Sequence, residues 1–308
     1  MGVNKNPPIS VVITTYNREN LVVRALKSVL IQTFKDFEVL VVDDGSTDNT
    51  RQVIQEIQKE DKRVVYVYQE NKGWPSALNT GLSNAQGRYI AFLDSDDEWL
   101  PEKLEKQAKV LEEFKNVGLV SCYAFRIFSE ETKKLYKTPY LGLFKKTRWK
   151  LFWEKWGIIS LSTVMVRKEV IEKVGFFDEK IKTGADIDFY LRCIKKFDFY
   201  FIHEPLISYY ESEESLSKKY FWKKWIPEYE YMLEKYREDF EECKKAKSRF
   251  LRNLGTCYVL NGDLNKAKKY LSEAILNNPI NIRLYFQFFL VLFPNLYKNL
   301  LFLKRKIF

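Results

Sequence analysis

Three aspartates within four residues follow an apolar run, and they are the residues of this sequence best suited to chemistry. The run covers residues 90–93, and the carboxylates after it are Asp94, Asp96 and Asp97. Such a run is typical of a strand buried on both faces, and open α/β sheets bind ligands at the carboxyl ends of their strands. Carboxylates this close repel one another unless a cation or a donor-rich ligand compensates their charge. A hard divalent metal would supply that compensation.

The same cluster has a simpler interpretation as the acidic start of a helix. Residues 101–104 have the composition of a first helical turn, and Asp96 or Asp97 could cap it. The cluster alone leaves both interpretations open. The upstream sequence favours a ligand site, because it repeats the pattern of an apolar strand followed by polar residues.

Strands and helices alternate along this upstream region. Apolar strands are expected at 9–17, 37–42, 64–68 and 89–93, and apolar residues at helical spacing predict helices at about 21–30, 53–57 and 77–85. This alternation implies a parallel sheet with right-handed crossovers, so the polar strand ends should share one edge. The residues expected at that edge are Thr14, Tyr16, Asn17, Asp43, Asp44, Asn71, Gly73, Asp94, Asp96 and Asp97.

Six motifs in order resemble glycosyltransferase family 2, which has the Rossmann-like GT-A fold. They are VVITTYNR at 11–18, QTF at 32–34, VVDDGSTD at 41–48, NKG at 71–73, GRYIAFLDSDD at 87–97, and GFFDE at 175–179 before Asp186. Each motif is weak alone, but six in sequence across residues 8–217 are specific. The resemblance implies an α/β domain at 1–217 with a mostly parallel central sheet flanked by helices. A C-terminal α-helical region is expected at 218–308.

The resemblance also implies how a nucleoside-diphosphate sugar is held. The first loop, here Thr14, Tyr16 and Asn17, and the second-strand aspartates, here Asp43 and Asp44, hold the base and ribose. Carboxylates suit this task because they accept hydrogen bonds from base N–H groups and ribose hydroxyls. A turn followed by a helix cap is the alternative interpretation of these aspartates. The expected donor-binding set also includes Asn71, Gly73, Asp94 and Ser95.

The acidic cluster resembles the DxD element of the family. This implies Asp96 as the main metal ligand and Asp94 as a second one near the ribose, with Asp97 behind them or capping a helix. Mg²⁺ and Mn²⁺ prefer oxygen ligands and would stabilise the charge that builds on a leaving diphosphate. The sequence has one histidine, His203, so a zinc site of the His or Cys type is not expected.

Asp186 is the general base that the resemblance implies. It would deprotonate the acceptor hydroxyl during inverting transfer. Ala185 stands where family members usually carry a glutamate, and a carboxylate in a first helical turn is favoured by the helix dipole even without a catalytic role. Asp188 should face elsewhere, because residues two apart do not share a helix face.

Two further positions depart from the family pattern. Leu78 stands where an arginine is common, so Arg88 or Lys72 could replace its contact with the diphosphate. Ser212 stands where a histidine is expected. These departures leave room for a catalytically weakened nucleotide-sugar-binding scaffold. Sugar-phosphate nucleotidyl transfer is a second alternative, but the first strand is not followed by a Gly-rich phosphate loop.

The C-terminal third carries the whole formal charge of +10, because residues 218–308 contain 19 Lys and Arg against 9 Asp and Glu. No nucleic-acid-binding module is recognisable, so nucleic acid is not expected as a partner. Aromatic residues interleave with lysines at 149–153 and 220–225, and 284–293 is nearly all apolar, which favours contact with an anionic membrane surface. The alternative is a buried C-terminal helix with a solvated basic end.

No apolar stretch is long enough for a membrane span, and the first eight residues carry no secretory signal. The sequence therefore predicts a cytoplasmic protein, which would be peripheral on the inner face of the cell membrane if its C-terminal segment contacts the membrane and is not a buried helix. Residues 248–281 resemble one tetratricopeptide repeat, which would brace the C-terminal segment. The matching positions are Leu254, Gly255, Tyr258, Gly262, Ala267, Leu271, Ala274 and Pro279.

Together these features predict a metal-dependent inverting glycosyltransferase with Mn²⁺ or Mg²⁺ as its cofactor. It would move a sugar from a nucleoside-diphosphate sugar to a hydroxyl of a glycan or lipid-linked acceptor, as in polysaccharide biosynthesis. A UDP-sugar donor is implied by the resemblance only.

Overall fold

The structure is a computed structural model that describes residues 7–129, 132–155, 160–210, 221–293 and 296–297. It divides into two compact units. The first comprises Met1–Trp149, Gly157–Glu179 and Ala185–Ser212, and the second comprises Lys150–Trp156, Lys180–Gly184 and Glu213–Phe308. The sequence placed a single boundary at residue 217, which lies outside the described residues. The second unit also takes two short segments from before that point.

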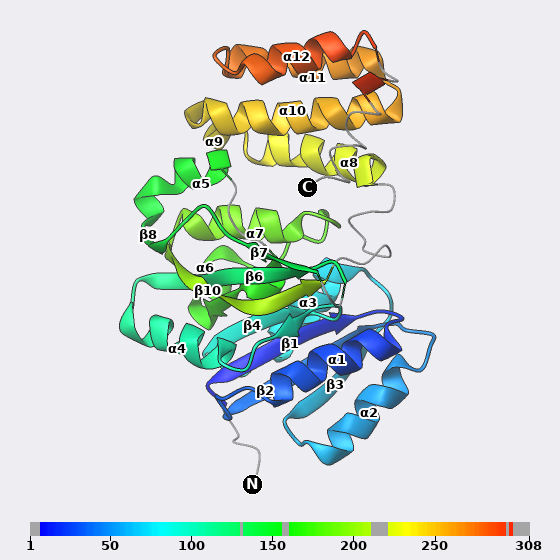
Figure 1. The fold of residues 1–308 in the computed structure, drawn as a ribbon, viewed down its shortest axis with the longest axis vertical. Helices are drawn as coiled ribbons and strands as arrows, with labels where there is room; N and C mark the ends of the chain where they lie inside the picture. The colour runs from blue at the N-terminus through cyan, green and yellow to red at the C-terminus, as the bar shows by residue number, and fades with distance from the viewer. Residues whose placement is uncertain (1–6, 130–131, 156–159, 211–220, 294–295, 298–308) are drawn as a thin grey trace. The chain divides into compact units, whose positions relative to one another are not determined.

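A ten-stranded mixed sheet forms the first unit and confirms the expected α/β class (Figure 1). Its main order is β3 (Val64–Gln69), β2 (Phe37–Asp44), β1 (Ile9–Thr15), β4 (Tyr89–Asp94), β9 (Met165–Arg167), β6 (Val117–Ile127), β10 (Asp198–Tyr210) and β5 (Glu98–Trp99). β7 (Lys133–Tyr136) pairs with β6, and β8 (Gly142–Phe144) pairs with β10. The first four strands of this order are parallel, as the alternation of strands and helices predicted.

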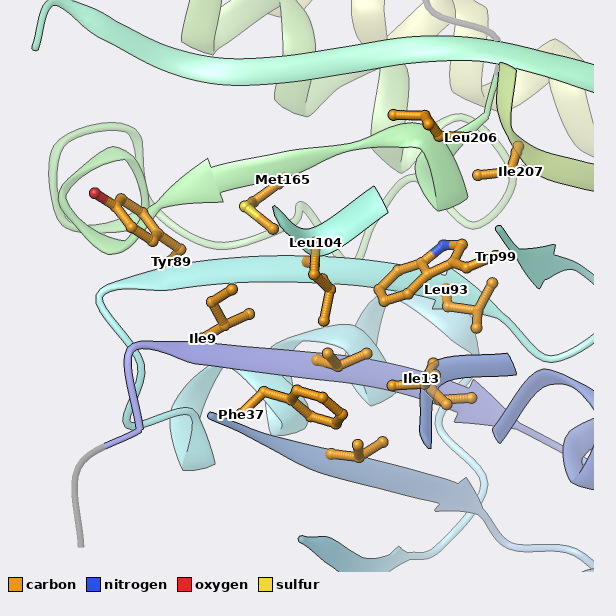
Figure 2. Packing of buried hydrophobic residues seen from close by; sticks show 14 of the residues in the cluster. Ile9, Ile13, Phe37, Tyr89, Leu93, Trp99, Leu104, Met165, Leu206 and Ile207 are labelled. Atoms are coloured by element: carbon orange, nitrogen blue, oxygen red, sulfur yellow. The ribbon is translucent and has the colours of Figure 1, made fainter. Parts of the chain in front are cut away.

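Helices cover both faces of these parallel strands. They are α1 (Glu19–Leu30), α2 (Thr50–Glu60), α3 (Trp74–Asn84) and α4 (Lys103–Glu113). Side chains alternate across a strand, so Ile13 joins the cluster that includes Leu26 of α1 and Leu104 of α4, whereas Val12 lies against Gly81 of α3. Figure 2 shows part of this cluster, including Ile13 and Leu104. The complete burial of β1 and β2 follows from this two-sided cover.

The strand register brings the polar strand ends to one edge of the sheet. Thr14 of β1 pairs with Asp94 of β4, and Thr15 pairs with Asp43 of β2. The edge predicted from the sequence is therefore confirmed. The cap interpretation of the acidic cluster is wrong, because β5 follows the cluster and the N-cap of α4 is Glu102.

The remaining elements of the chain are mostly helical. They are η1 (Lys146–Arg148), α5 (Trp149–Lys155), η2 (Leu161–Thr163), α6 (Lys168–Val174), α7 (Ala185–Ile194), α8 (Phe221–Lys235), α9 (Arg237–Glu242), α10 (Lys244–Asn261), α11 (Leu264–Asn277) and α12 (Ile282–Leu290). In the second unit, α10 packs against α8 and α11, and α11 packs against α12 (Figure 1).

A tight helical hairpin joins α10 and α11. Gly262 forms the turn with φ of +93°, and Asp263 caps α11 by accepting from the N–H of Lys266. A Cβ on Gly255 would lie 2.8 Å from the Leu271 side chain, so the two helices approach closely there. The helical region expected at 218–308 is confirmed in its described residues, while its identity as a tetratricopeptide repeat stays a prediction. No helix in the described residues has the length and apolar content to cross a membrane.

Candidate functional site

Hydrogen bonds tie the loop after β1 to the loop after β2. Asn17 adopts a left-handed backbone conformation with φ of 50°, which asparagine tolerates better than most residues. Its Oδ1 accepts from the N–H of Thr47 at 2.7 Å, and its own N–H donates to Ser46 Oγ at 2.9 Å. Asn17 is thus a loop-fixing residue in this structure. Beside it, Tyr16 is 47% exposed, whereas Thr14 is buried.

Asp43 acts as a turn residue, which was the alternative interpretation of its carboxylate. It is fully buried, and its oxygens accept from the N–H of Ser46 and the hydroxyl of Tyr66, both at 2.8 Å. Burial and this hydrogen bond to Asp43 raise the pKa of Tyr66. Direct contact between Asp43 and a nucleotide stays a prediction, and this geometry does not favour it.

Asp44 braces the loop after β3. Its carboxylate accepts from Gln69 Nε2 at 2.6 Å and from the N–H groups of Lys72 and Gly73, both at 2.9 Å. Gly45 follows with φ of +79°, and a Cβ there would lie 2.8 Å from the Asn71 nitrogen. Only glycine fits this close approach of the two loops. The sequence did not reveal that Asp44 holds the segment containing Asn71 and Gly73.

Asp97 is a buried structural carboxylate. It accepts from Ser162 Oγ at 2.6 Å and from the N–H of Tyr210 at 3.2 Å, which links the end of β4 to η2 and β10. Desolvation, followed by the charges of Asp94 and Asp96, raises its pKa well above the usual range. The role of the Ser162 hydroxyl had no local sequence signal, since the aspartates it bonds to lie 65 or more residues away.

Asp94 lies among other negative charges. Desolvation raises the pKa of its carboxyl to about 7, and the charges of Asp96 and Asp186 contribute to the increase. Its N–H donates to Ser162 Oγ at 3.1 Å. Asp96 and Asp186 therefore both act on Asp94, although Asp186 comes from a helix about ninety residues later in the chain.

Two arginines that the sequence interpretation missed surround the cluster. Arg18 pairs with Asp96 at 2.9 Å and donates to Ser95 Oγ at 3.2 Å. Arg24 donates to the Asp96 carbonyl oxygen at 2.6 Å, and its guanidinium carbon lies 3.8 Å from the centre of the Tyr210 ring. The sequence did offer a signal for Arg18, because Arg18 is the last residue of the first motif, VVITTYNR.

Arg88 is not at this site. It precedes β4, at the opposite end of the strand from the acidic cluster, and pairs with Glu112. The hypothesis that Arg88 replaces the missing arginine at Leu78 is therefore wrong. Lys72 does lie in the loop that Asp44 braces. Ser212, the other departure, lies outside the described residues.

The first turn of α7 carries two aspartates, Asp186 and Asp188, which have different surroundings. Asp188 is buried and pairs with Arg192 at 2.9 Å, so it faces the protein interior as expected. Asp186 instead influences Asp94 and Tyr190 electrostatically. Desolvation and the charges of Asp186 and Asp94 raise the pKa of Tyr190. The buried Tyr190 hydroxyl has no hydrogen-bond partner in the described part of the chain.

Asn79 attaches the GFFDE motif to α3. Its Oδ1 accepts from the N–H of Phe177 at 2.9 Å, and its Nδ2 donates to the Phe177 carbonyl at 3.0 Å and to Glu179 Oε1 at 2.9 Å. This clamp and the Arg192 bond to the Phe176 carbonyl at 2.9 Å fix the segment from both sides.

The carboxylates fit part of the coordination shell of a hard divalent cation. Mg²⁺ is commonly held by one or two carboxylates, with phosphate oxygens and waters as its other ligands. Asp96 and Asp94 carry such oxygens, and desolvation followed by the charges of Asp96 and Asp186 disfavours the ionised form of Asp94, which a cation beside it would stabilise. Within the described ranges no three Asp, Glu, His or Cys side chains form a ligand set, so the remaining ligands would come from substrate and water.

Comparison with known proteins identifies relatives over most of the first unit. The family model for glycosyl transferase family 2 matches residues 10–175. TuaG of Bacillus subtilis, assigned provisionally as a teichuronic acid biosynthesis glycosyltransferase, is 36% identical over 219 residues, covering 70% of this chain and 83% of TuaG. An uncharacterized glycosyltransferase of Rickettsia prowazekii is 32% identical over 204 residues, covering 66% of this chain but only 63% of that relative.

Solved structures share the fold at low sequence identity. TarS 1–349 of S. aureus, in complex with UDP-GlcNAc, has a TM-score of 0.63 and 18% identity, covering 86% of this chain and 81% of that one. The mannosyltransferase PcManGT of Pyrobaculum calidifontis, in complex with GDP-Man and Mn²⁺, has a TM-score of 0.57 and 19% identity, covering 89% and 76%.

Proposed function

The chain belongs to glycosyl transferase family 2, and on this premise we propose that it transfers a sugar from a nucleoside-diphosphate sugar to an acceptor hydroxyl with inversion. The observation that carries the proposal is the position of Asp94 at the edge where the parallel strands end, with the charges of Asp96 and Asp186 both acting on it. Asp94 and Asp96 belong to one sequence motif, and Asp186 follows another. The nucleotide sugars bound by TarS and PcManGT support a donor of this class.

The donor would lie across the loops at the strand ends. We propose that Tyr16 stacks on the base, while Asn17, Asp44, Asn71 and Gly73 shape the pocket for base and ribose. A uridine nucleotide, as in the TarS complex, is our proposed donor, with the guanosine nucleotide of PcManGT as the alternative.

The diphosphate would lie nearer the acidic cluster. Asp94 would approach the ribose, with Ser95 beside it, and Arg18 would donate to the phosphate oxygens. Asp96 and Asp94 would hold Mg²⁺ or Mn²⁺, which when bound stabilises negative charge on the leaving diphosphate.

Asp186 is the proposed general base. Its carboxylate takes the proton of the acceptor hydroxyl as the acceptor oxygen attacks the anomeric carbon. The bond from that carbon to the diphosphate breaks, and the nucleoside diphosphate leaves with the electron pair. The products are the glycosylated acceptor, the nucleoside diphosphate and the proton on Asp186. A glycan or lipid-linked alcohol is the proposed acceptor.

A thermal-shift panel of nucleotide sugars, with and without Mn²⁺, tests the donor proposal. A ligand that binds only the native protein raises its melting temperature. We expect at least one nucleoside-diphosphate sugar to do so, more strongly with Mn²⁺. Release of the free nucleoside diphosphate then distinguishes a transferase from a binding scaffold. A response to nucleoside triphosphate and sugar phosphate, with pyrophosphate release, would instead support nucleotidyl transfer.

We further propose that α12 contacts an anionic membrane surface, because its outward face is apolar. Ile282, Phe286 and Phe289 are each more than half exposed, while Leu284 and Leu290 are buried against the second unit. Their spacing places the exposed side chains along one helix face. Sedimentation with anionic liposomes should decrease for Phe286→Ser/Phe289→Ser. Equal sedimentation of variant and parent would contradict this role.

A further inference from the structure

A cavity of about 360 Å³ lies within the second unit and has a basic lining. Its size falls at the lower end of the roughly 300–1,000 Å³ typical of small-ligand sites. Most such sites are apolar, whereas this one is lined by four cations and two side-chain amides. They are Lys155, Lys245, Arg249, Arg252, Asn278 and Asn281.

One face of α10 supplies most of this charge. Lys245, Arg249 and Arg252 follow one another at spacings of four and three residues, so they share a face of the helix. The lysines at the neighbouring positions, Lys244 and Lys247, both pair with Glu241. Glu241 of α9 thus pairs with one set of the α10 cations, while the other set lines the cavity.

Arg252 is a half-buried member of this set of cations. Its Nε and Nη2 donate to Asn253 Oδ1 at 3.3 and 3.0 Å, and it forms no ion pair with a carboxylate of the described residues. Desolvation lowers its pKa, and the nearby positive charge of Arg283 acts in the same direction. Arg252 is half-buried, and an anion beside it would favour its charged form.

The other lining groups are held in position by hydrogen bonds. Arg249 Nη1 donates to the Glu154 carbonyl oxygen at 2.9 Å, which fixes the guanidinium at the end of α5. Glu154 is the one acidic residue among the described lining residues, and its Oε1 lies 4.0 Å from Cys243 Sγ. Ser248 Oγ donates to the Ala274 carbonyl at 2.7 Å, which fixes α10 on α11.

We propose that this cavity binds a phosphate group. Lys155, Lys245 and Arg252 alone bring three positive charges against the one carboxylate of Glu154, and arginine pairs well with the several oxygens of a phosphate. The amide groups of Asn278 and Asn281 add neutral donors. The phosphate would belong either to a soluble phosphorylated compound or to a lipid headgroup. The inference does not depend on the proposed transfer reaction.

Calorimetric titration of the full chain with inorganic phosphate and with pyrophosphate, without divalent metal, tests this site. A parallel arm measures sedimentation with phosphatidylcholine vesicles that contain or lack phosphatidic acid. We expect saturable binding to at least one phosphate probe, weakened by at least about tenfold in Arg252→Gln, as for loss of a charge-assisted hydrogen bond. Lys268→Gln removes the same charge from α11 outside the cavity and should change affinity by less than about twofold.

Arg18→Gln separates this site from the donor site, because it alters the first unit only and should retain phosphate binding. Binding of free phosphate or pyrophosphate would support a soluble ligand, and binding only to vesicles with phosphatidic acid would support a lipid headgroup. Absence of binding to every probe would overturn the proposal, as would equal weakening by Arg252→Gln and Lys268→Gln. If Arg252→Gln melts early, Lys245→Gln, at an exposed position, makes the same comparison.

Discussion

Asp94, Asp96 and Asp97 lie within four residues but differ in what they contact, and these contacts decide which mutation tests which role. Asp97 bonds to Ser162 and Tyr210 inside the protein. Asp96 pairs with Arg18 near the surface, and Asp94 lies between the other negative charges. Asp96 is therefore the member that can be neutralised with little cost to folding.

We expect Asp96→Asn to abolish metal-supported donor binding while the protein stays folded. The substitution relieves repulsion with Asp94 and Asp97, and the lost pair with Arg18 is worth about 0–1 kcal/mol at a partly exposed site. Calorimetry with donor and Mn²⁺ measures the binding. Asp97→Asn is the matched control and should keep metal-supported donor binding, because the Asp97 carboxylate bonds to Ser162 and Tyr210 inside the protein. Parent-like affinity in Asp96→Asn would refute the metal role.

Asp186→Asn should separate catalysis from binding. Donor affinity should stay near that of the parent, while turnover falls by about 10²-fold or more because a general base is lost. Asp188→Asn, two residues later, breaks the buried pair with Arg192 and should mainly reduce stability. Unchanged turnover in Asp186→Asn would assign the base elsewhere, and loss of donor binding would make Asp186 structural.

Lys103 gives a pH dependence outside the site. Its side chain is buried over the Trp99 ring and donates to Gln107 Oε1 at 2.7 Å. Burial lowers the pKa of Lys103 to about 7, against 10.5 for an exposed lysine. Between these values the unfolded chain binds more protons than the folded one, so the free energy of unfolding rises with pH.

Lys103→Met should remove this rise. From pH 7 to about pH 9.5 the parent should gain on the order of 1–3 kcal/mol relative to the variant. Urea denaturation of both proteins at both pH values measures the difference. The contributions of tyrosines and cysteines that titrate in both proteins cancel in this difference. A difference that does not change with pH would show that Lys103 stays charged in the folded protein.

At the scale of elements, the hairpin of α10 and α11 depends on Gly255. Gly255→Ala would place a Cβ 2.8 Å from Leu271 Cγ, and overpacking of this kind costs about 1–3 kcal/mol, more than the ~1 kcal/mol that alanine gains in helix propensity. The variant should therefore be less stable. In a Leu271→Ala background the closest contact is gone and only the 3.3 Å approach to the Ala267 carbonyl oxygen remains, so the same substitution should destabilise the protein less. Thermal denaturation of the four proteins measures this difference, and additive effects would contradict the contact.

The sequence predicted the elements better than their side-chain contacts. The strands and helices around β1 to β4 follow from local apolar periodicity, and parallel pairing then brings Thr14 beside Asp94. The contacts of Ser162, Arg18 and Asp44 join segments far apart in the chain, and no local pattern encodes them. Arg88 was assigned to the wrong end of β4 because residue type was considered without strand direction.

At the scale of the whole molecule, the second unit includes a segment that directly precedes Asp186. Glu228 of α8 accepts hydrogen bonds from the N–H groups of Lys182, Thr183 and Gly184 and from the Thr183 hydroxyl. The carboxylate is buried, so these bonds hold residues 182–184 firmly. Chain continuity then connects this anchor to the start of α7.

Glu228→Gln should lower stability by about 2–4 kcal/mol, because an amide replaces charge-assisted bonds with one acceptor and an unsuitable donor. It should also lower turnover several-fold without changing donor affinity. Glu230→Gln is the matched control, since Glu230 bonds to the hydroxyls of Tyr258 and Tyr270 on α10 and α11. It should lower stability, but the turnover per folded molecule should stay unchanged. Equal effects of the two variants on turnover would contradict a positioning role for Glu228.

The anchor at Glu228 also sets an order of events during synthesis on the ribosome. Glu228 lies 44 residues after Gly184, so at about 5–20 residues per second it is made roughly 2–9 s later than the segment it holds. The strands that carry the first donor-binding loops are complete well before then. A nascent or prematurely terminated chain would therefore form the proposed donor edge before the proposed base, Asp186, is anchored. If both proposals hold, such a chain could bind a nucleotide sugar before it could transfer the sugar.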